Sequence, residues 1–155
     1  MYCIIPDIET HRYPKPAGKD MLILGITYGR ITVSDLEGGI TMPFIDSKVS
    51  VKITEEQEKE LKTRLGQAIS LIPGKSENWL MTGFEDDYHM YFRGDNSEPI
   101  AYIEVRIFGG PNKAAFQKMT EEITKIYGDV LGIAPDHMYI KYSATPDWGW
   151  NGGNF

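Results

Sequence analysis

Two stretches of the chain alternate apolar and polar residues, which is the pattern of a β-strand with one buried face. In residues 44–51 the apolar positions are Ile45, Val49 and Val51. Residues 101–108 alternate without a break: one face carries Ala101, Ile103, Val105 and Ile107, and the other carries Tyr102, Glu104, Arg106 and Phe108. Two shorter apolar stretches, residues 79–84 and 138–142, predict two more strands, and residues 88–92 are a candidate hairpin strand.

A helical period follows each alternating stretch. Thr54 begins the first helix, because its hydroxyl group and the amide of Gln57 are spaced as a capping box. The inward stripe of this helix consists of Leu61, Leu65, Ala68, Ile69 and Ile72. Pro73-Gly74 ends the first helix, Asn112 caps the second, and Gly132 and Pro135 end that one. The inward positions of the second helix are Ala115, Phe116, Met119, Ile123, Ile126 and Tyr127.

These elements repeat along the chain. A shift of 58 residues carries Ile45 onto Ile103, the cap Thr54 onto Asn112, and Gly74 onto Gly132. The repeat predicts two β-α-β units and an α+β (α/β) fold, in which two helices cover one face of a four-stranded mixed sheet. Because the uncovered face of this sheet is too apolar for water alone, we expect another subunit to cover it.

The first 41 residues differ in composition from residues 43–155, which we expect to form the domain. Their one strand-like patch, residues 21–33, is interrupted by Gly25 and Gly29. Because they show no sustained amphipathic pattern, we expect them to pack poorly against the two helices.

Met42 is a candidate start of the natural chain. Glu37-Gly38-Gly39 can be encoded by GAA-GGA-GG, which contains the purine-rich signal of bacterial ribosomes, at a workable spacing before the Met42 codon. We therefore interpret residues 1–41 as a non-domain segment that results from a misplaced start. A genuine flexible N-terminal arm is the alternative.

The composition of the 155 residues argues against several classes of function. A net charge of −6 and a pI near 5.1 make nucleic acid or an anionic membrane an unfavourable partner. The single cysteine, Cys3, excludes an intramolecular disulfide and a cysteine-built metal site. The longest apolar run, residues 21–24, is too short to span a bilayer. With no visible signal peptide, we expect a cytoplasmic protein, with release without a signal peptide as the alternative.

Pro43 is the sharpest candidate for chemistry. An initiator methionine is normally removed before a small residue, which would leave Pro43 with a free secondary amine at the head of a buried strand. An apolar pocket and a nearby lysine both disfavour the charged form of that amine, so it could act as a general base. The alternative is a proline that only opens an edge strand. Glu85-Asp86-Asp87-Tyr88-His89 could hold a metal ion, but we interpret these residues as a solvated turn, and we expect no cofactor.

Short motifs spread over residues 42–155 carry a resemblance to a known family. They are Met42-Pro43-Phe44-Ile45, Gly74-Lys75, Ser97-Glu98-Pro99, Pro135-Asp136, Tyr139-Ile140, and Gly149-Trp150-Asn151 with Phe155. Together they resemble the macrophage migration inhibitory factor and D-dopachrome tautomerase family of the tautomerase superfamily. The resemblance implies a trimer of β-α-β repeats with active sites at the subunit interfaces.

The resemblance also implies roles for individual residues. Pro43 would be the catalytic base, and Lys75 the cation that holds a substrate carboxylate or lowers the pKa of the proline amine. Taken alone, Lys75 would be a solvated residue near a helix C-terminus. Tyr139 would come from the neighbouring subunit as a pocket wall. The substrate-binding set is completed by Phe108, Lys141 and Trp148, which stand where the family's cytokine has isoleucine, asparagine and valine.

These departures make the expected pocket more aromatic and more cationic than that of the cytokine. Ile100 and Ile103 replace the cytokine's Cys-x-x-Cys pair, so its thiol-redox activity is not expected. The expected function is keto–enol tautomerisation of small aromatic 2-oxo acids such as phenylpyruvate by a homotrimer, provided that Pro43 is the N-terminus. The alternative is a cytokine-like trimer that binds a protein receptor and has a vestigial pocket.

Overall fold

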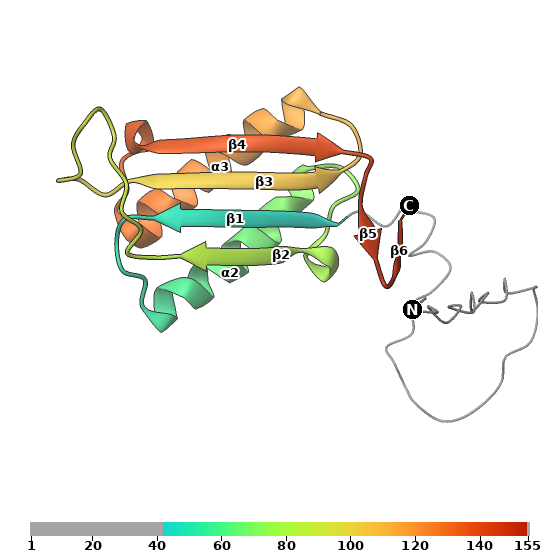
Figure 1. Cartoon of the computed structure of the whole chain (residues 1–155), viewed down its shortest axis with the longest axis horizontal. Helices are drawn as coiled ribbons and strands as arrows, with labels where there is room; N and C mark the ends of the chain where they lie inside the picture. The colour runs from blue at the N-terminus through green and yellow to red at the C-terminus, as the bar shows by residue number, and fades with distance from the viewer. Residues whose placement is uncertain (1–41, 155) are drawn as a thin grey trace, which may run out of the picture. The chain divides into compact units, whose positions relative to one another are not determined.

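The computed structural model describes residues 42–154, so the expectations for residues 1–41 and for Phe155 lie outside the described residues. The four main strands are β1 (Pro43–Val49), β2 (Met81–Glu85), β3 (Ala101–Phe108) and β4 (Met138–Thr145). They form one sheet in the order β2-β1-β3-β4, shown in Figure 1. β1 runs parallel to β2, β3 runs parallel to β4, and the two central strands are antiparallel. This is the mixed sheet that the repeat predicts.

Two helices, α2 (Glu55–Ala68) and α3 (Lys113–Leu131), cover one face of the sheet (Figure 1). Both predicted caps are confirmed. The hydroxyl of Thr54 accepts a hydrogen bond from the N–H of Gln57 at 3.2 Å, and the side chain of Gln57 accepts one from the N–H of Thr54 at 3.0 Å. The side chain of Asn112 accepts from the N–H of Ala115 at 3.0 Å. Three short 3₁₀ turns complete the helical segments: η1 (Ile69–Leu71), η2 (Glu77–Trp79) and η3 (Pro135–His137).

The two β-α-β units share their backbone conformation as well as their order of elements. Gly74 and Gly132, which the 58-residue shift superposes, both follow a helix with positive φ angles of 77° and 69°. A side chain at either position would be strained, because this left-handed conformation is favourable only for glycine. The two repeats therefore use the same glycine conformation where the chain leaves the helix and returns to the sheet.

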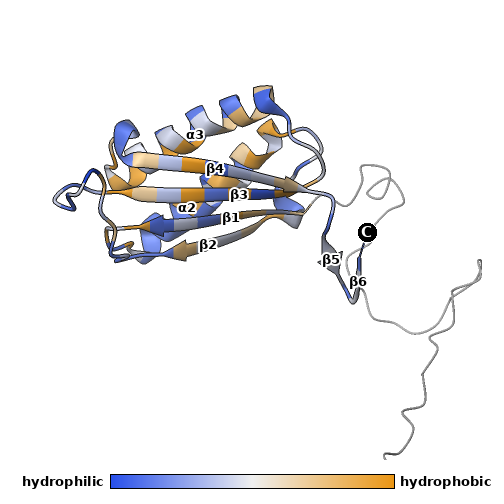
Figure 2. Cartoon of the chain, turned by 45° about the horizontal axis from the view of Figure 1, so that its top comes forward, coloured by the Kyte–Doolittle hydropathy of each residue, from blue (hydrophilic) through white to orange (hydrophobic). Residues whose placement is uncertain are grey.

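The core lies between the helices and the sheet. Its fully buried side chains include Ile45, Val49, Leu61, Leu65, Ile103, Val105, Met119, Ile123, Ile126 and Tyr127. In Figure 2 the turns of α3 that lie away from the sheet are hydrophilic. Phe116, expected to face inward, is only partly buried and stacks on Tyr142 of β4 with the ring centroids 4.4 Å apart.

The structure differs from the sequence prediction in the loop after β2. Residues 88–92 form no strand; the only pairing in this loop is a single bridge between Phe92 and Asp95. The N–H groups of Asp87 and Tyr88 bond instead to the carbonyls of Val51 and Val49, which ties the loop to the end of β1. Residue 79 lies in η2 rather than in the second strand, which begins two residues later.

A small hairpin of β5 (Gly149–Trp150) and β6 (Gly153–Asn154) follows β4 and lies beyond the end of the main sheet (Figure 1). The described part of the chain contains no helix whose length and apolar character would suit a membrane span.

Candidate active site

Pro43 is the first residue of β1 and is buried. In the antiparallel register of β1 with β3 it faces Ile107, near the end of β3. Met42 precedes it, so its nitrogen in this chain is a tertiary amide without a basic lone pair. The position has the burial that lowers the pKa of an amine, but the amine itself exists only if the chain begins at Pro43.

Lys75 lies in the turn between α2 and β2, directly after the left-handed Gly74. Only 9% of its surface is exposed, so the alternative of a solvated lysine is wrong. Its ammonium group donates a hydrogen bond to the backbone carbonyl oxygen of Phe108 at 2.7 Å. Burial lowers the pKa of Lys75, because the low-dielectric surroundings disfavour its charge.

Pro43, Lys75 and Phe108 therefore converge on the same end of β3. Pro43 is paired with Ile107, and the next residue provides the carbonyl that holds Lys75. Phe108 is half-buried on the face of the sheet that no helix covers, and it pairs with Thr145 of β4. An apolar side chain, a buried cation and a strand-initial proline are thus gathered around one strand end.

Trp148 lies in the short connection between β4 and β5, three residues after the end of β4 at Thr145. Its indole N–H is buried and has no hydrogen-bond partner among residues 42–154. A buried donor without an acceptor costs about 1–3 kcal/mol. Such a group is a candidate donor to an oxygen atom of a bound ligand.

Trp79 and Trp150 were not among the predicted site residues. Their rings meet edge to face with centroids 5.5 Å apart, which joins η2 to the small hairpin. Trp79 is four residues beyond Lys75, and Trp150 is two residues beyond Trp148. For Trp150 the available signal was the resemblance itself, because the Gly149-Trp150-Asn151 motif belongs to it.

Tyr139 and Lys141 do not join this group within one protomer. Tyr139 pairs with Tyr102, which pairs with Lys48, five register positions from Pro43 along β1. At about 3.3 Å per residue and about 4.8 Å per strand, Tyr139 is about 16 Å along and about 10 Å across the sheet from Pro43. Lys141 is three register positions away and on the opposite face of the sheet.

Lys141 belongs to a network of ion pairs on the uncovered face of the sheet. Its ammonium group lies 3.2 Å from the carboxylate of Glu104, which faces it in register. The same carboxylate accepts hydrogen bonds from Arg106 at 2.9 Å and from Ser143 at 2.7 Å. Arg106 also pairs with Asp46 at 3.1 Å. These contacts lower the pKa of Glu104 to about 2, with the hydrogen bond from Arg106 as the largest cause.

An aromatic cleft of about 400 Å³ surrounds Tyr139 at the other end of the sheet. It is lined by Tyr88, Met90, Tyr91, Phe92, Tyr102 and His137, among others. Phe92 contacts both His137 and Tyr139 edge to face. The exposed fractions of Tyr91 and Tyr139 are 69% and 64%, so this end of the molecule presents large apolar side chains to its surroundings.

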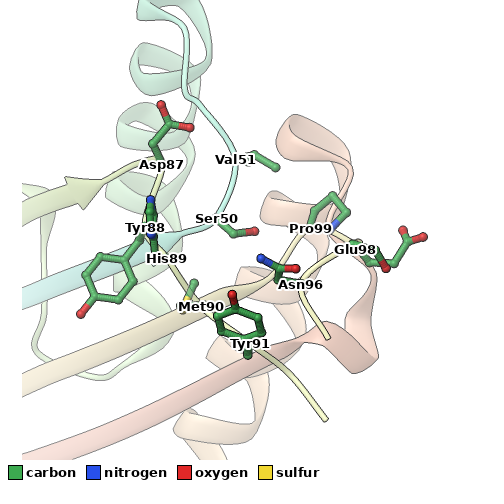
Figure 3. A pocket seen from close by; sticks show the side chains of 11 residues that line it. Ser50, Val51, Asp87, Tyr88, His89, Met90, Tyr91, Asn96, Glu98 and Pro99 are labelled. Atoms are coloured by element: carbon green, nitrogen blue, oxygen red, sulfur yellow. The ribbon is translucent and has the colours of Figure 1, made fainter. Parts of the chain in front are cut away.

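A second cavity of about 590 Å³ adjoins the cleft, between the end of β1 and the loop (Figure 3). Ser50, His89 and Glu98 are among its polar lining residues. The described residues contain no group of three or more His, Cys, Asp or Glu side chains that could hold a metal ion.

Comparison with known proteins gives a consistent result. The family model described as "Macrophage migration inhibitory factor (MIF)" matches residues 42–155. MIF2 of Leishmania major is 32% identical, with a TM-score of 0.68, and the match covers 74% of this chain and 97% of that one. A macrophage migration inhibitory factor homologue from Prochlorococcus marinus is 31% identical, with a TM-score of 0.65 and coverage of 72% and 98%.

A more distant similarity extends to the fold alone. The macrophage migration inhibitory factor-like protein of Entamoeba histolytica is 22% identical, with a TM-score of 0.66 and coverage of 74% of this chain and 99% of that one. No curated protein matches the chain by sequence.

Proposed function

The chain belongs to the macrophage migration inhibitory factor family, and from this premise we propose that it is a keto–enol tautomerase of phenylpyruvate-like 2-oxo acids in the form that begins at Pro43. The observation that carries the proposal is the convergence of buried Pro43 and buried Lys75 on the end of β3. Membership of the tautomerase superfamily supports an isomerase in general; the substrate class and the role of Pro43 are our proposal.

In the proposed reaction the secondary amine of Pro43 removes a proton from the carbon next to the keto group. The electron pair of that C–H bond forms the C=C bond of an enolate, and the negative charge moves to the keto oxygen. Transfer of the proton from the prolinium nitrogen to this oxygen gives the enol and restores the amine. The reverse sequence returns the keto form, so no co-reactant is consumed.

Lys75 provides the fixed positive charge that this reaction needs. An ammonium group has three donors, and the carbonyl of Phe108 accepts one of them. Another can bind the substrate carboxylate or oppose the charge that develops on the enolate oxygen. The indole N–H of Trp148 is a second candidate donor, and the half-buried ring of Phe108 is a candidate contact for the aromatic ring of the substrate.

The proposal includes a homotrimer whose sites are shared between subunits. Tyr139 and Lys141 lie far from Pro43 of their own chain, so they can contribute only to the site of a neighbour. The exposed aromatic side chains around Tyr139 support a contact at this end of the sheet.

The experiment compares two forms of the chain in the tautomerisation of phenylpyruvate. A form that starts at Met42, with the methionine removed, should be active, and the 155-residue form should be nearly inactive because its Pro43 nitrogen is an amide. The expected gap is about 10²–10⁴-fold, the usual contribution of a positioned general base. Pro43→Ala in the short form, which keeps a primary amine, should retain part of the activity.

Equal rates in the two forms, followed by the absorbance of the enol, contradict the role of Pro43. The cytokine-like alternative makes a different prediction. If the pocket is vestigial, the short form is inactive towards 2-oxo acids, and covalent capping of Pro43 leaves receptor binding intact.

A further inference from the structure

Glu104 is the centre of the ion-pair network on the uncovered face of the sheet. Its carboxylate is 12% exposed, although it carries a charge, and both of its oxygen atoms are engaged. One oxygen accepts from Ser143 and lies 3.2 Å from the ammonium of Lys141; the other accepts from Arg106. Three partners on two strands therefore hold this side chain in one place.

The network is balanced in charge. Asp46 and Glu104 carry two negative charges, and Arg106 and Lys141 carry two positive ones. Lys141 has its ion pair only with Glu104 among the described residues, whereas Arg106 is shared between both carboxylates. Removal of the negative charge of Glu104 would leave the positive charge of Lys141 without a partner. Removal of the negative charge of Asp46 would leave the pair of Glu104 and Lys141 intact.

Lys141 is 57% exposed, so its ammonium group is accessible to a ligand at the same time as it is held by Glu104. It lies two residues from Tyr139 on the same strand and the same face of the sheet. If Tyr139 forms a wall of the neighbouring subunit's site, the pair of Glu104 and Lys141 therefore lies close to that site as well.

We propose that Glu104 is a positioning residue that cancels the charge of Lys141 and so makes the trimer's active sites selective for 2-oxo acids with a single anionic group. This inference rests on the proposed function. Without Glu104, Lys141 would attract a second carboxylate on the far side of an aromatic substrate. With Glu104 in place, a second carboxylate meets a neutral pair and gains no comparable contact.

The test uses the form that begins at Pro43, which contains all the core residues of the fold and the whole stretch matched by the family model. The readout is the ratio of kcat/KM for 4-carboxyphenylpyruvate to that for phenylpyruvate. Glu104→Gln should raise this ratio about tenfold, as expected for one uncompensated charge at close range in a partly buried site. A change that only weakens the fold lowers both values and leaves the ratio unchanged.

Asp46→Asn is the matched control, because it changes the net charge by the same amount on the same face but leaves the pair of Glu104 and Lys141 intact. Its ratio should stay within about twofold of the wild type. The double variant Glu104→Gln/Lys141→Gln should return to the wild-type ratio. Lys141→Gln alone should lower the ratio, because it leaves Glu104 as the nearest charge.

An equal rise in Asp46→Asn overturns the proposal, because the effect would then follow net charge. A rise that persists in the double variant overturns it as well, since Glu104 would then act without Lys141. If Glu104→Gln does not fold, Lys141→Gln decides, and an unchanged ratio there refutes the role. If the wild-type form that begins at Pro43 does not turn over phenylpyruvate, the proposed function is wrong, and this inference, which rests on it, is wrong as well.

Discussion

The ammonium group of Lys75 donates a hydrogen bond of 2.7 Å to the backbone carbonyl of Phe108, 33 residues further along the chain. The contact joins the turn after α2 to the end of β3, and so links the first β-α-β unit to the second. It also buries a cation whose ammonium group has this one carbonyl as its acceptor among residues 42–154. Burial of a charge with so little compensation is costly. A charge held in this way, at the end of β3 that Pro43 faces, agrees with the substrate-binding role that we propose for Lys75.

Substitution of Lys75 by methionine tests its burial through the pH dependence of stability. Burial lowers the pKa of Lys75 in the folded chain below its ordinary value of 10.5. Between these two values the unfolded chain holds a proton that the folded chain has released, so the free energy of unfolding rises with pH. Lys75→Met lacks this contribution. The stability difference between Lys75→Met and the wild type should therefore change in favour of the wild type as the pH rises towards 10.5.

Urea unfolding of both chains at a series of pH values from 7 upward measures this difference, in which groups common to both chains cancel. Lys125→Met is the control, because it removes the same charge from an exposed position on α3. Parallel curves for Lys75→Met would show that Lys75 titrates as it does in water.

Ser47 and Tyr127 make a hydrogen bond inside the core, with their hydroxyl oxygens 2.5 Å apart. Both side chains are fully buried, on β1 and α3. Ser47→Ala should cost about 1–3 kcal/mol in the free energy of unfolding, because it leaves the hydroxyl of Tyr127 buried without its partner. Tyr127→Phe should cost a similar amount. The double variant should be less destabilised than the sum of the two, as chemical denaturation would measure; strict additivity would mean that the two hydroxyls do not depend on each other.

The fold was predictable because its signals are local. The two periods of apolar residues, the caps Thr54 and Asn112, and the glycines 74 and 132 each act within a few residues of their position. The prediction of a strand in the loop after β2 was wrong because strand pairing is not a local property. The apolar residues at 88–92 resemble a strand, but a strand also needs a partner strand. At the start of this loop, the N–H groups of Asp87 and Tyr88 bond instead to the carbonyls of Val51 and Val49.

The site was predictable only in part. Pro43 was a candidate from its own chemistry, and the resemblance added Lys75. The burial of Lys75, however, depends on a carbonyl that no local pattern connects with it. The pairing of Lys141 with Glu104 depends on the register of β3 with β4, which residue types alone do not determine. The unpartnered N–H of Trp148 is a property of the folded connection after β4 and has no counterpart in the sequence.

Trp148→Phe tests whether this N–H serves a ligand. The substitution keeps an aromatic ring and removes the donor. The free protein should be unchanged or more stable, by up to about 1–3 kcal/mol, because an unsatisfied buried group is lost. In the form that begins at Pro43, kcat/KM for phenylpyruvate should fall about tenfold, as for the loss of one hydrogen bond to a charged group.

Trp150→Phe is the matched control, since it makes the same chemical change in the ring that packs on Trp79. Its effect on kcat/KM should be smaller than that of Trp148→Phe. If Trp148→Phe lowers stability and leaves kcat/KM intact, the indole N–H has a structural partner in solution and is not a substrate donor.

The last prediction concerns the sharing of active sites between subunits. Pro43 and Tyr139 lie five register positions and two strands apart in one protomer, so a site that uses both must combine two chains. Sedimentation equilibrium of the form that begins at Pro43 should show a trimer, and a monomer at micromolar concentration contradicts the shared site.

In such a trimer, activity should be recovered by mixing two defective chains. One chain has a capped Pro43 nitrogen and an intact Tyr139, and the other has a free Pro43 and the substitution Tyr139→Ala. After joint unfolding and refolding, some sites in mixed trimers unite a free Pro43 with an intact Tyr139, and the activity should exceed the sum of the two chains refolded separately. A site contained in one protomer cannot gain from mixing, so strictly additive activities in proven mixed trimers would show that Tyr139 does not serve the neighbour's Pro43.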